Sequence, residues 1–571
     1  MTTQPPNELE WWKRTTIYQI YPRSFKDSTC NGVGDIQGII SKLDYLQDLG
    51  IETIWFSPFF SSPQQDHGYD VSDYRDIAPE YGTMKDCELL IEEIHNRNMF
   101  IILDLVLNHT SDQHPWFLES RSSLDNPKRD WYIWRDGSKS GGKKPPNNWN
   151  SIVGGSGWHY DELTDQWYWA QFLPFQPDLN YRNPEVKTEM FDTVRFWLEK
   201  GADGFRLDII NTIYEDPELR NNPFTWTYLP SEEHTKSFFR DNIYTINHPD
   251  NFEFAKELRQ VMDEFSDPTR FLVGEITASL PILKQFCGEM IDDYKSNGLH
   301  MTFQFQSLGA KFNLETFRSL IQEYEQIFPE PYIPTWVFSN HDQVRRISRL
   351  GGNMEKAKLN ATLQLTARGV PFIYYGEEIG MLQADFSVKD AQDPIARKYA
   401  WLPRIISSIL QKIGNLSLNR DECRTPMQWD EGPNAGFCPS NASPWLSIGP
   451  KYDEINVEHE EKDFNSLLSC YKRLLKLRRT MPALQSGSIT INEIPRFKEE
   501  LLVYSRKNDA EFKQVVEVWL NFSNKQIHYH ENLSSYELKF STNGDTDSIN
   551  DSGIRLEPYQ GIILEISIER K

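Results

Sequence analysis

Short apolar segments rich in β-branched and aromatic residues alternate along the chain with longer segments that have the spacing of amphipathic helices. The segment Pro184–Gly201 is typical of the helical kind, because it begins with proline, ends with glycine and repeats apolar residues at intervals of three and four. Ile36–Gly50 follows the same pattern. The pattern predicts eight strands: Thr16–Tyr21, Thr53–Pro58, Phe100–Leu107, Gly204–Ile209, Phe271–Ile276, His300–Phe305, Thr335–Ser339 and Pro371–Tyr375.

This alternation of strands and helices predicts the fold class. Strands separated by helices pair in parallel, and eight of them close a (β/α)8 TIM barrel. An open doubly wound sheet is the alternative, but no glycine-rich phosphate loop follows the first strand. We therefore predict an α/β protein built on a barrel.

Two segments depart from the alternation and predict further domains. Residues 109–178 are rich in Trp, Asn, Gly and Pro and lack a helical period, which indicates a small subdomain inserted after the third strand. Residues 481–571 alternate apolar and polar positions between polar turns, as in an antiparallel β-domain. The barrel would then comprise 1–108 and 179–480. Its long polar connection 383–450, after the eighth strand, we expect to be functional.

Charge and composition exclude several kinds of partner. The formal net charge of −23 argues against nucleic-acid binding by a broad basic surface. No apolar run is long enough to span a bilayer and the first residues have no apolar signal core, so we expect a cytoplasmic protein with no membrane partner. The six cysteines are scattered without a CxxC pair, which predicts free thiols. The oligomeric state stays open.

Charged residues gather where the predicted strands end, and active residues of a barrel stand at the C-terminal ends of its strands. Because side chains alternate along a strand, Arg206 and Asp208 face the same way at the end of the fourth strand. Strand five ends at Glu275 and strand seven near Asp342. The residues expected to converge on one mouth are therefore Asp104, His109, Arg206, Asp208, Glu275, His341 and Asp342.

A buried pair such as Arg206 and Asp208 can also serve packing alone. Carboxylates at the ends of three strands are harder to explain in this way, because burying unpaired carboxylates is costly. Paired carboxylates near aromatic residues suit glycoside hydrolysis, in which one carboxylate attacks the anomeric carbon and a protonated second one donates to the leaving oxygen. We predict that Arg206 keeps Asp208 ionised as the attacking group.

The motifs resemble those of glycoside hydrolase family 13, the α-amylase superfamily, and are most similar to its α-glucosidase and oligo-1,6-glucosidase branch. The resemblance implies an exo-acting, retaining α-glucosidase that acts on short α-glucosides such as isomaltose and maltose and needs no cofactor for catalysis. It covers nearly the whole chain in the right order and rests on QIYPRSF, GYDVSDY, DLVLNH, QPDLN, GFRLD, GE, SNHD, GVPFIYYGEEIG and RTPMQWD.

Carried over to matching positions, the resemblance also implies individual roles. Asp208 would be the nucleophile, Glu275 the general acid and base, and Asp342 the residue that grips the sugar hydroxyls. Asp66 and Arg424 would close the pocket by binding the non-reducing glucose, which implies an exo-acting enzyme. The other expected substrate-binding residues are Tyr69, His109, Phe172, Arg206, Ile209 and His341.

The segment DSTCNGVGD spaces oxygen side chains around glycines, as calcium loops do. Resembling proteins carry such a loop, although Thr29 and Asn31 make this version less acidic. One interpretation is a structural Ca2+ held by Asp27, Thr29 or Asn31, the Val33 carbonyl and Asp35; the other is an ordinary polar turn.

Two other functions remain as alternatives. A transglucosidase or sucrose isomerase would pass the glucosyl group to a sugar instead of water. A non-enzymatic transporter heavy-chain relative would need a membrane helix before the barrel and often lacks the carboxylates. For the bond cleaved, the bulky Ile209 next to Asp208 resembles the α-1,6 type, whereas segment 211–250 resembles α-1,4-specific relatives. We predict appreciable isomaltose hydrolysis.

Overall fold

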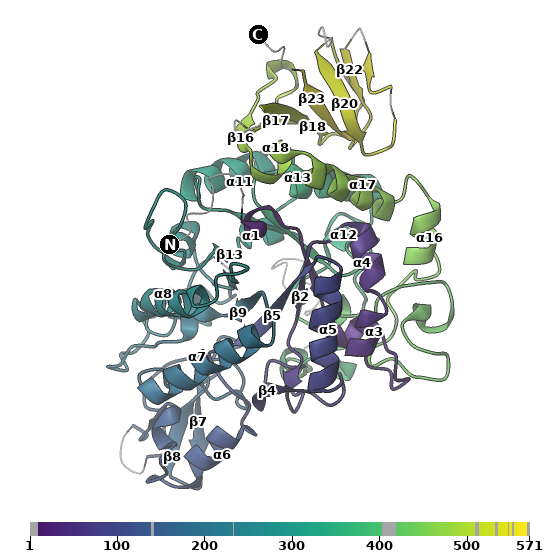
Figure 1. Ribbon diagram of the computed structural model, residues 1–571. Coiled ribbons are helices and arrows are strands. Elements are labelled where there is room, and N and C mark those ends of the chain that lie inside the picture. Colours follow the sequence, from purple (N-terminus) through teal and green to yellow (C-terminus); the bar gives the residue numbers. More distant parts are fainter. Residues whose placement is uncertain are drawn as a thin grey trace.

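The computed structural model describes residues 10–138, 142–231, 233–401, 418–508, 513–530, 535–545, 547–550 and 553–567. At its centre lies a parallel sheet with the order β13-β12-β9-β5-β2-β1-β15-β14, surrounded by helices (Figure 1). Every predicted strand overlaps one of these eight, and the predicted barrel class is confirmed. The strands are β1 (Ile17–Ile20), β2 (Thr53–Phe56), β5 (Phe100–Val106), β9 (Gly204–Asp208), β12 (Phe271–Gly274), β13 (Met301–Thr302), β14 (Thr335–Val337) and β15 (Val370–Tyr374).

Side chains bridge the seam between β13 and β14, the two ends of this order. The backbone N–H of Gln304 donates to the Thr335 hydroxyl at 3.0 Å, and that hydroxyl donates to the Thr302 carbonyl at 3.2 Å. The N–H of Val337 donates to the Ser307 hydroxyl at 3.1 Å. Backbone groups that lack a strand partner are thereby satisfied, and the sheet is nearly closed.

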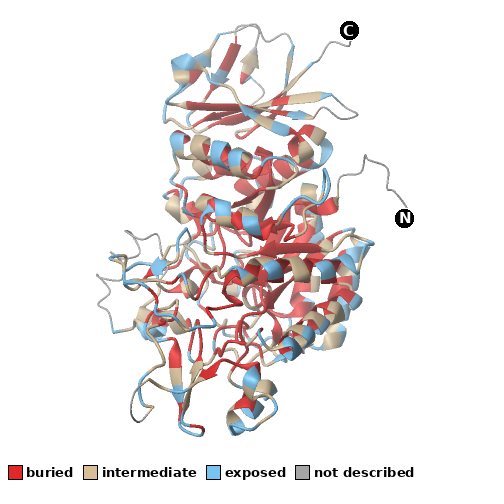
Figure 2. Cartoon of the chain, turned by 90° about the vertical axis from the view of Figure 1, so that its left-hand side faces the viewer, coloured by how far each residue is buried: buried red, intermediate tan, exposed pale blue. Residues whose placement is uncertain are grey.

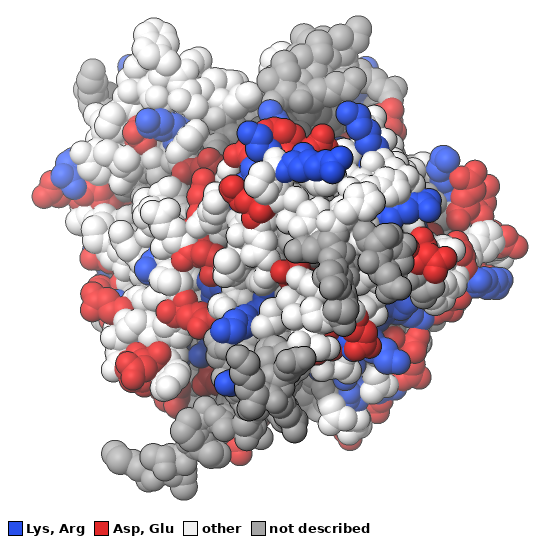
Figure 3. Space-filling model, turned by 90° about the horizontal axis from the view of Figure 1, so that it is seen from above, with Lys and Arg blue, Asp and Glu red and all other residues white. Residues whose placement is uncertain are grey.

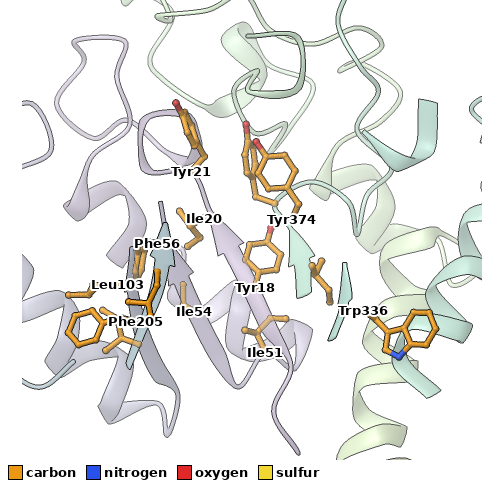
Figure 4. Packing of buried hydrophobic residues seen from close by; sticks show 14 of the residues in the cluster. Tyr18, Ile20, Tyr21, Ile51, Ile54, Phe56, Leu103, Phe205, Trp336 and Tyr374 are labelled. Carbon is orange, nitrogen blue, oxygen red and sulfur yellow. The ribbon is translucent and has the colours of Figure 1, made fainter. Parts of the chain in front are cut away.

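Side chains alternate between the helix layer and the barrel interior. On β9, Phe205 belongs to the large cluster that joins strands to helices, and Figure 4 shows it beside Phe56 and Leu103. Residues of the other parity, such as Trp55 and Val273, form a separate cluster within the barrel. The strands are buried throughout (Figure 2). This apolar interior supports the polar residues that stand at the strand ends.

The helices begin and end at residues that the sequence marks. In α5 (Met84–Asn96), Thr83 and Asp86 form a reciprocal capping box. Asn183 caps α7 (Pro184–Glu199), which has proline in its first turn. The segment Ile36–Gly50 forms two helices, α3 (Ile36–Ile40) and α4 (Leu43–Leu49), and α4 ends at Gly50 with a φ of 100°. The other long barrel helices are α8 (Asp250–Asp263), α11 (Leu314–Ile327) and α13 (Met354–Thr366).

The insertion and the C-terminal segment form separate layers at opposite ends of the view in Figure 1. In the insertion, α6 (Pro115–Ser122) accompanies a small sheet of order β6-β8-β7. The C-terminal segment has a five-stranded antiparallel sheet of order β16-β17-β18-β23-β20, packed on the barrel side by α17 (Leu467–Thr480) and α18 (Pro482–Ser486). The domain boundaries given above stay predictions. The strands of the two sheets are β6 (Trp134–Arg135), β7 (Trp158–Asp161), β8 (Gln166–Trp169), β16 (Ser488–Ile491), β17 (Leu501–Asn508), β18 (Gln514–Asn521), β20 (Tyr536–Ser541) and β23 (Gly561–Ile566).

The surface and the thiols agree with the composition. On the face seen in Figure 3, acidic and basic side chains are interspersed. All six cysteines are free thiols. Within the described ranges, no helix combines the length and apolarity that a bilayer crossing needs. Of the connection 383–450, residues 402–417 lie outside the described residues.

Candidate active site

Arg206, on β9, is shared by three carboxylates. Its Nη1 donates to Oδ1 of Asp104 and to Oδ1 of Asp208, at 2.7 Å each, and its Nη2 contacts the Glu275 carboxylate. Asp104 lies directly opposite Arg206 on the neighbouring β5, and Glu275 follows β12, the neighbour on the other side. The sheet order therefore assembles this group, and Arg206 and Asp208 do face the same way.

Burial and charge act against each other in this group. Burial raises the pKa of Asp208, and the Arg206 guanidinium counteracts that effect. Burial likewise raises the pKa of Asp104 to about 7, again against the influence of Arg206. Because one cation faces three carboxylates, it cannot neutralise all of them. Asp104 can therefore hold a proton near neutral pH.

Asp342 is held by two arginines and a histidine. Its Oδ1 accepts from Arg424 Nη2 at 2.9 Å and from Arg420 Nη1 at 3.2 Å, and its Oδ2 lies 3.1 Å from His341 Nε2. Burial raises the pKa of Asp342, but His341, Arg420 and Arg424 outweigh that effect and hold it well below its usual range. Asp342 is thus a permanent anion at the strand-seven end.

His341 has a defined tautomer in this network. Its Nδ1 lies 2.9 Å from the amide nitrogen of Gln19, so Nδ1 accepts and Nε2 carries the proton. Its Nε2 lies 2.6 Å from the Tyr69 hydroxyl, and the two rings stack at 5.4 Å. Burial lowers the pKa of His341 to about 3, so the ring is neutral. One face of Tyr69 is therefore already occupied by a neighbouring ring.

His109 and Phe172 form another part of the wall. The Nε2 of His109 lies 3.0 Å from the Tyr69 carbonyl, and its Nδ1 lies 3.2 Å from the Asn108 amide nitrogen. Burial lowers the pKa of His109 to about 4. The Phe172 ring lies 5.2 Å from the His109 ring. Phe172, which precedes QPDLN, and His109, which ends DLVLNH, therefore meet as expected for two residues of one pocket.

The residue that pairs with Asp66 is Arg420, whereas the sequence analysis assigned Arg424 together with Asp66 to this end of the pocket. Arg420 Nη2 lies 2.8 Å from Asp66 and 2.8 Å from Asp393. Arg424 is completely buried and donates to Asp342 and to the His341 carbonyl. The short helix Arg420–Cys423 separates the two arginines: both contact Oδ1 of Asp342, but Arg420 also pairs with Asp66.

These residues line a cavity of about 510 Å3. Its inner end consists of charged and polar side chains at the strand ends. Its outer part comes from the loop after β9, the insertion and the connection after β15. The connection 383–450 was expected to be functional, but the outer lining residues were not named because loop residues show no periodicity. Inner lining residues include Asp66, Tyr69, His109, Phe172, Asp208, Glu275, His341, Asp342 and Arg420, and outer ones include Ile152, Val153, Tyr228, Leu229, Phe238, Ile246, Ile395 and Tyr399.

Ile209 lies at the junction of the two parts. It has a φ of 38° and a ψ of 50°, a left-handed conformation that β-branched residues rarely adopt. The ladder between β9 and β12 continues around it, since Glu275 N–H donates to the Leu207 carbonyl at 2.9 Å and Ile210 N–H donates to the Glu275 carbonyl at 3.2 Å. Backbone strain of this kind is typical of functional sites.

Asp178, from the QPDLN motif, forms a buried carboxyl pair with Glu215 beside His109. Asp178 accepts from the Gln171 N–H at 2.9 Å, and Glu215 accepts from Trp169 Nε1 at 3.1 Å. Burial raises the pKa of Glu215 to about 8 and, together with Glu215, raises that of Asp178 well above its usual value. The pair therefore holds a proton near neutral pH, a feature that the motif alone did not reveal.

In the expected calcium loop, the side-chain oxygens accept hydrogen bonds from N–H groups of the same segment. Asp27 accepts from the N–H groups of Thr29, Cys30 and Gly32, at 2.8 Å each. Asp35 accepts from Ser28, Thr29 and Gly38, and Asn31 Oδ1 accepts from Val33 N–H. Donor N–H groups face the oxygens that a cation would need, so this arrangement does not fit Ca2+. Among the described residues, no group of three or more His, Cys, Asp or Glu side chains could hold a metal.

Comparisons with known proteins match most of the chain. Residues 19–487 match the family described as alpha-amylase, catalytic domain. The oligo-1,6-glucosidase of Parageobacillus thermoglucosidasius is 38% identical over 98% of this chain and 100% of that enzyme. The crystal structure of an alpha-glucosyl transfer enzyme, XgtA, has a TM-score of 0.86 at 34% identity, covering 98% of this chain and 100% of that one. The trehalulose synthase MutB from Pseudomonas mesoacidophila MX-45 has a TM-score of 0.84 at 33% identity, with the same coverage.

Proposed function

The chain belongs to the alpha-amylase family, and we propose that Asp208 and Glu275 carry out its retaining hydrolysis of short α-glucosides. The protein is a glycoside hydrolase of the α-glucosidase branch, with relatives named oligo-1,6-glucosidase and alpha-glucosidase. The observation that carries the residue assignment is the contact of one guanidinium, Arg206, with both Asp208 and Glu275. A double displacement needs two carboxyl groups about 5–5.5 Å apart, and a shared guanidinium keeps two carboxyl groups near each other.

In the first step, the ionised Asp208 attacks the anomeric carbon of the terminal glucose. The glycosidic C–O bond breaks, and the leaving oxygen takes the proton of Glu275, so that a glucosyl ester and a free aglycone result. Arg206 supports this step because it opposes the rise that burial causes in the pKa of Asp208.

In the second step, Glu275 takes a proton from water, whose oxygen attacks the anomeric carbon and releases Asp208. Esterification of Asp208 has by then removed one of the negative charges that face Arg206. The positive charge is then shared with fewer carboxylates, which favours the ionised form of Glu275 that a base must have. Two inversions leave the configuration of the glucose unchanged.

Asp342 and the pair of Asp66 and Arg420 are assigned to the non-reducing glucose. Asp342 is ionised and lines the cavity, so it can accept hydrogen bonds from sugar hydroxyls. The ion pair of Asp66 with Arg420, anchored by Asp393, walls the inner end of the cavity. A chain of sugars cannot pass such a wall, which gives release of one terminal glucose at a time.

Two enzymes of similar structure support a second candidate function. A glucosyl transfer enzyme and a trehalulose synthase share this fold at TM-scores of 0.86 and 0.84. In such enzymes a sugar or another acceptor replaces water at the glucosyl ester. Incubation with sucrose and with concentrated maltose separates the two candidates, because hydrolysis yields glucose whereas transfer yields new glucosides.

One experiment tests the main assignment. Isomaltose, maltose, sucrose, trehalose and p-nitrophenyl α-glucoside are supplied in turn, and the anomeric form of the released glucose is followed by NMR. We expect appreciable hydrolysis of isomaltose with α-glucose as the first product. Initial release of β-glucose would contradict retention. A cytoplasmic location stays a prediction.

A further inference from the structure

A two-residue hairpin at the outer part of the cavity has unusual residues at its tip. Strands β10 (Lys236–Ser237) and β11 (Arg240–Asp241) pair so that Ser237 lies opposite Arg240. Phe238 and Phe239 form the turn between them, with φ values of 47° and 62°. Two-residue turns with positive φ at both positions strongly favour Asn and Gly, and bulky side chains are rare there. The chain therefore keeps two phenylalanines where local backbone energetics oppose them.

The two rings continue a row of aromatic side chains that leads out of the cavity. Phe238 lines the cavity and lies 5.4 Å from the Tyr228 ring, edge-on. Phe239 lies 5.1 Å from Tyr228 and stacks on Phe224 at 6.3 Å, and Phe224 lies 5.0 Å from Trp226. We call these five residues the aromatic row.

Four members of the aromatic row are exposed to solvent. The exposed fractions are 42% for Phe239, 50% for Tyr228, 57% for Phe224 and 86% for Trp226. Such contiguous exposed apolar surface is typical of binding sites. Burial in the core thus does not explain these side chains, whereas contact with a ligand that leaves the cavity does.

Backbone hydrogen bonds hold the aromatic row in place. The N–H of Phe238 donates to the Tyr228 carbonyl at 2.8 Å, and the N–H of Phe239 donates to the Thr227 carbonyl at 2.9 Å. The rings are therefore positioned before a ligand arrives, which lowers the entropy cost of binding.

We propose that the aromatic row, together with the outer cavity, binds the aglycone of α-glucosides whose aglycone is aromatic or a long alkyl group. The proposal rests on the proposed function and specifies its substrate class. Ile152, Val153, Leu229 and Ile246 add apolar surface to this part of the lining, beside polar residues such as His234 and Lys236. Against the apolar part of this wall a second sugar would lose hydrogen bonds to water, whereas an aryl or alkyl group gains by burial. The charged inner end serves the glucose alone.

The test replaces the strained tip by residues that the turn favours. The double variant Phe238→Asn/Phe239→Gly removes both rings and relieves the backbone strain, so its thermal midpoint should equal or exceed that of the wild type. Binding is measured as the inhibition constant of p-nitrophenyl 1-thio-α-glucoside, which is not turned over, beside the KM for isomaltose. We expect the inhibition constant to rise about tenfold and the KM for isomaltose to rise less than about twofold.

Two further variants test whether the loss of binding is specific to the aromatic row. Trp226→Ala should weaken inhibition by octyl 1-thio-α-glucoside more than by the p-nitrophenyl compound, because Trp226 lies furthest out. Leu163→Ala, which removes an exposed apolar side chain from the insertion, should change neither constant. Equal losses for isomaltose and the aryl compound would overturn the proposal in favour of a general sugar subsite, and so would an unchanged inhibition constant. Failure of the wild type to cleave any α-glucoside would instead refute the proposed function.

Discussion

At the inner end of the cavity, Arg206, Asp208 and Glu275 stand on or directly after adjacent strands of the sheet, whereas at the outer end Tyr228 and Phe238 stand on a loop. Arg206 and Asp208 are buried, Glu275 is partly buried, and all three are held by charged contacts. The outer ones are partly exposed and held mainly by backbone bonds of their own loop. This difference suggests that the inner end determines the chemistry and the glucose, and that the outer end determines what is attached to the glucose.

The largest effect should come from the inner end. Asp208→Asn keeps the size of the side chain and removes the charge that forms the covalent bond. We expect turnover of isomaltose and of p-nitrophenyl α-glucoside to fall by several orders of magnitude, with the thermal midpoint within a few degrees of the wild type. Steady-state kinetics and calorimetry are the measurements. A variant that retains a tenth of the activity would remove Asp208 from the chemistry.

The second largest effect should come from the ion pair of Asp66 and Arg420, which walls the inner end of the cavity. Asp66→Ala and Arg420→Ala should each lower kcat/KM for isomaltose by about 10²- to 10³-fold, because truncating one partner of a buried charge pair costs about 2–5 kcal/mol. The double variant should lose little more than either single one, since the two groups act together.

Arg424 provides the matched control for that cycle, because it contacts Asp342 but has no hydrogen bond to Asp66 in the structure. Its coupling with Asp66 should be smaller than that of Arg420. Strictly additive losses for Asp66 and Arg420 would show that the ion pair does not wall the pocket as a unit.

A smaller effect, on the choice between isomaltose and maltose, should come from Ile209, where the inner and outer parts of the cavity meet. Ile209→Thr replaces a bulky side chain next to Asp208 and should shift the ratio of kcat/KM values from isomaltose toward maltose, by up to about tenfold. Ile209→Val is the control, because it keeps the branched carbon and should keep the ratio. The kinetic constants for both sugars are measured in all three proteins. An unchanged ratio in the threonine variant would exclude Ile209 as a determinant of the bond cleaved.

The buried carboxyl pair of Asp178 and Glu215 should have the smallest effect on catalysis. Its effect should appear in the pH dependence of stability. Burial raises the pKa of Glu215 from 4.5 to about 8, so its protonated form stabilises the folded state fully below about pH 4.5. This stabilisation is lost as the pH rises through about 8. The thermal midpoint should therefore fall between about pH 5 and about pH 9, and Glu215→Gln should flatten that fall. Glu218→Gln, at an exposed position, should not. A glutamine variant with the wild-type pH profile would contradict the assignment.

The two ends also differ in how far the sequence predicts them. The strand ends were predictable because side-chain alternation along Gly204–Asp208 fixes which residues face inward, and the sheet order brings neighbours together. Arg420 was missed because it lies four residues before Arg424, and nothing in the motif shows which of them faces Asp66. The aromatic row was missed because Tyr228 and Phe238 meet only where the loop before the hairpin bonds to the hairpin turn, and loop sequence does not encode such a contact as a period.

The central claim is that Asp208 forms the covalent bond to glucose. The most direct measurement incubates the enzyme with a 5-fluoro-α-glucosyl fluoride, whose ester intermediate is hydrolysed slowly, and locates the adduct by mass spectrometry of peptides. We predict that the mass of one fluoroglucosyl unit appears on the peptide that contains Asp208, and that Asp208→Asn shows no adduct. An adduct on another carboxylate, or turnover through direct attack by water with no adduct, would contradict the claim.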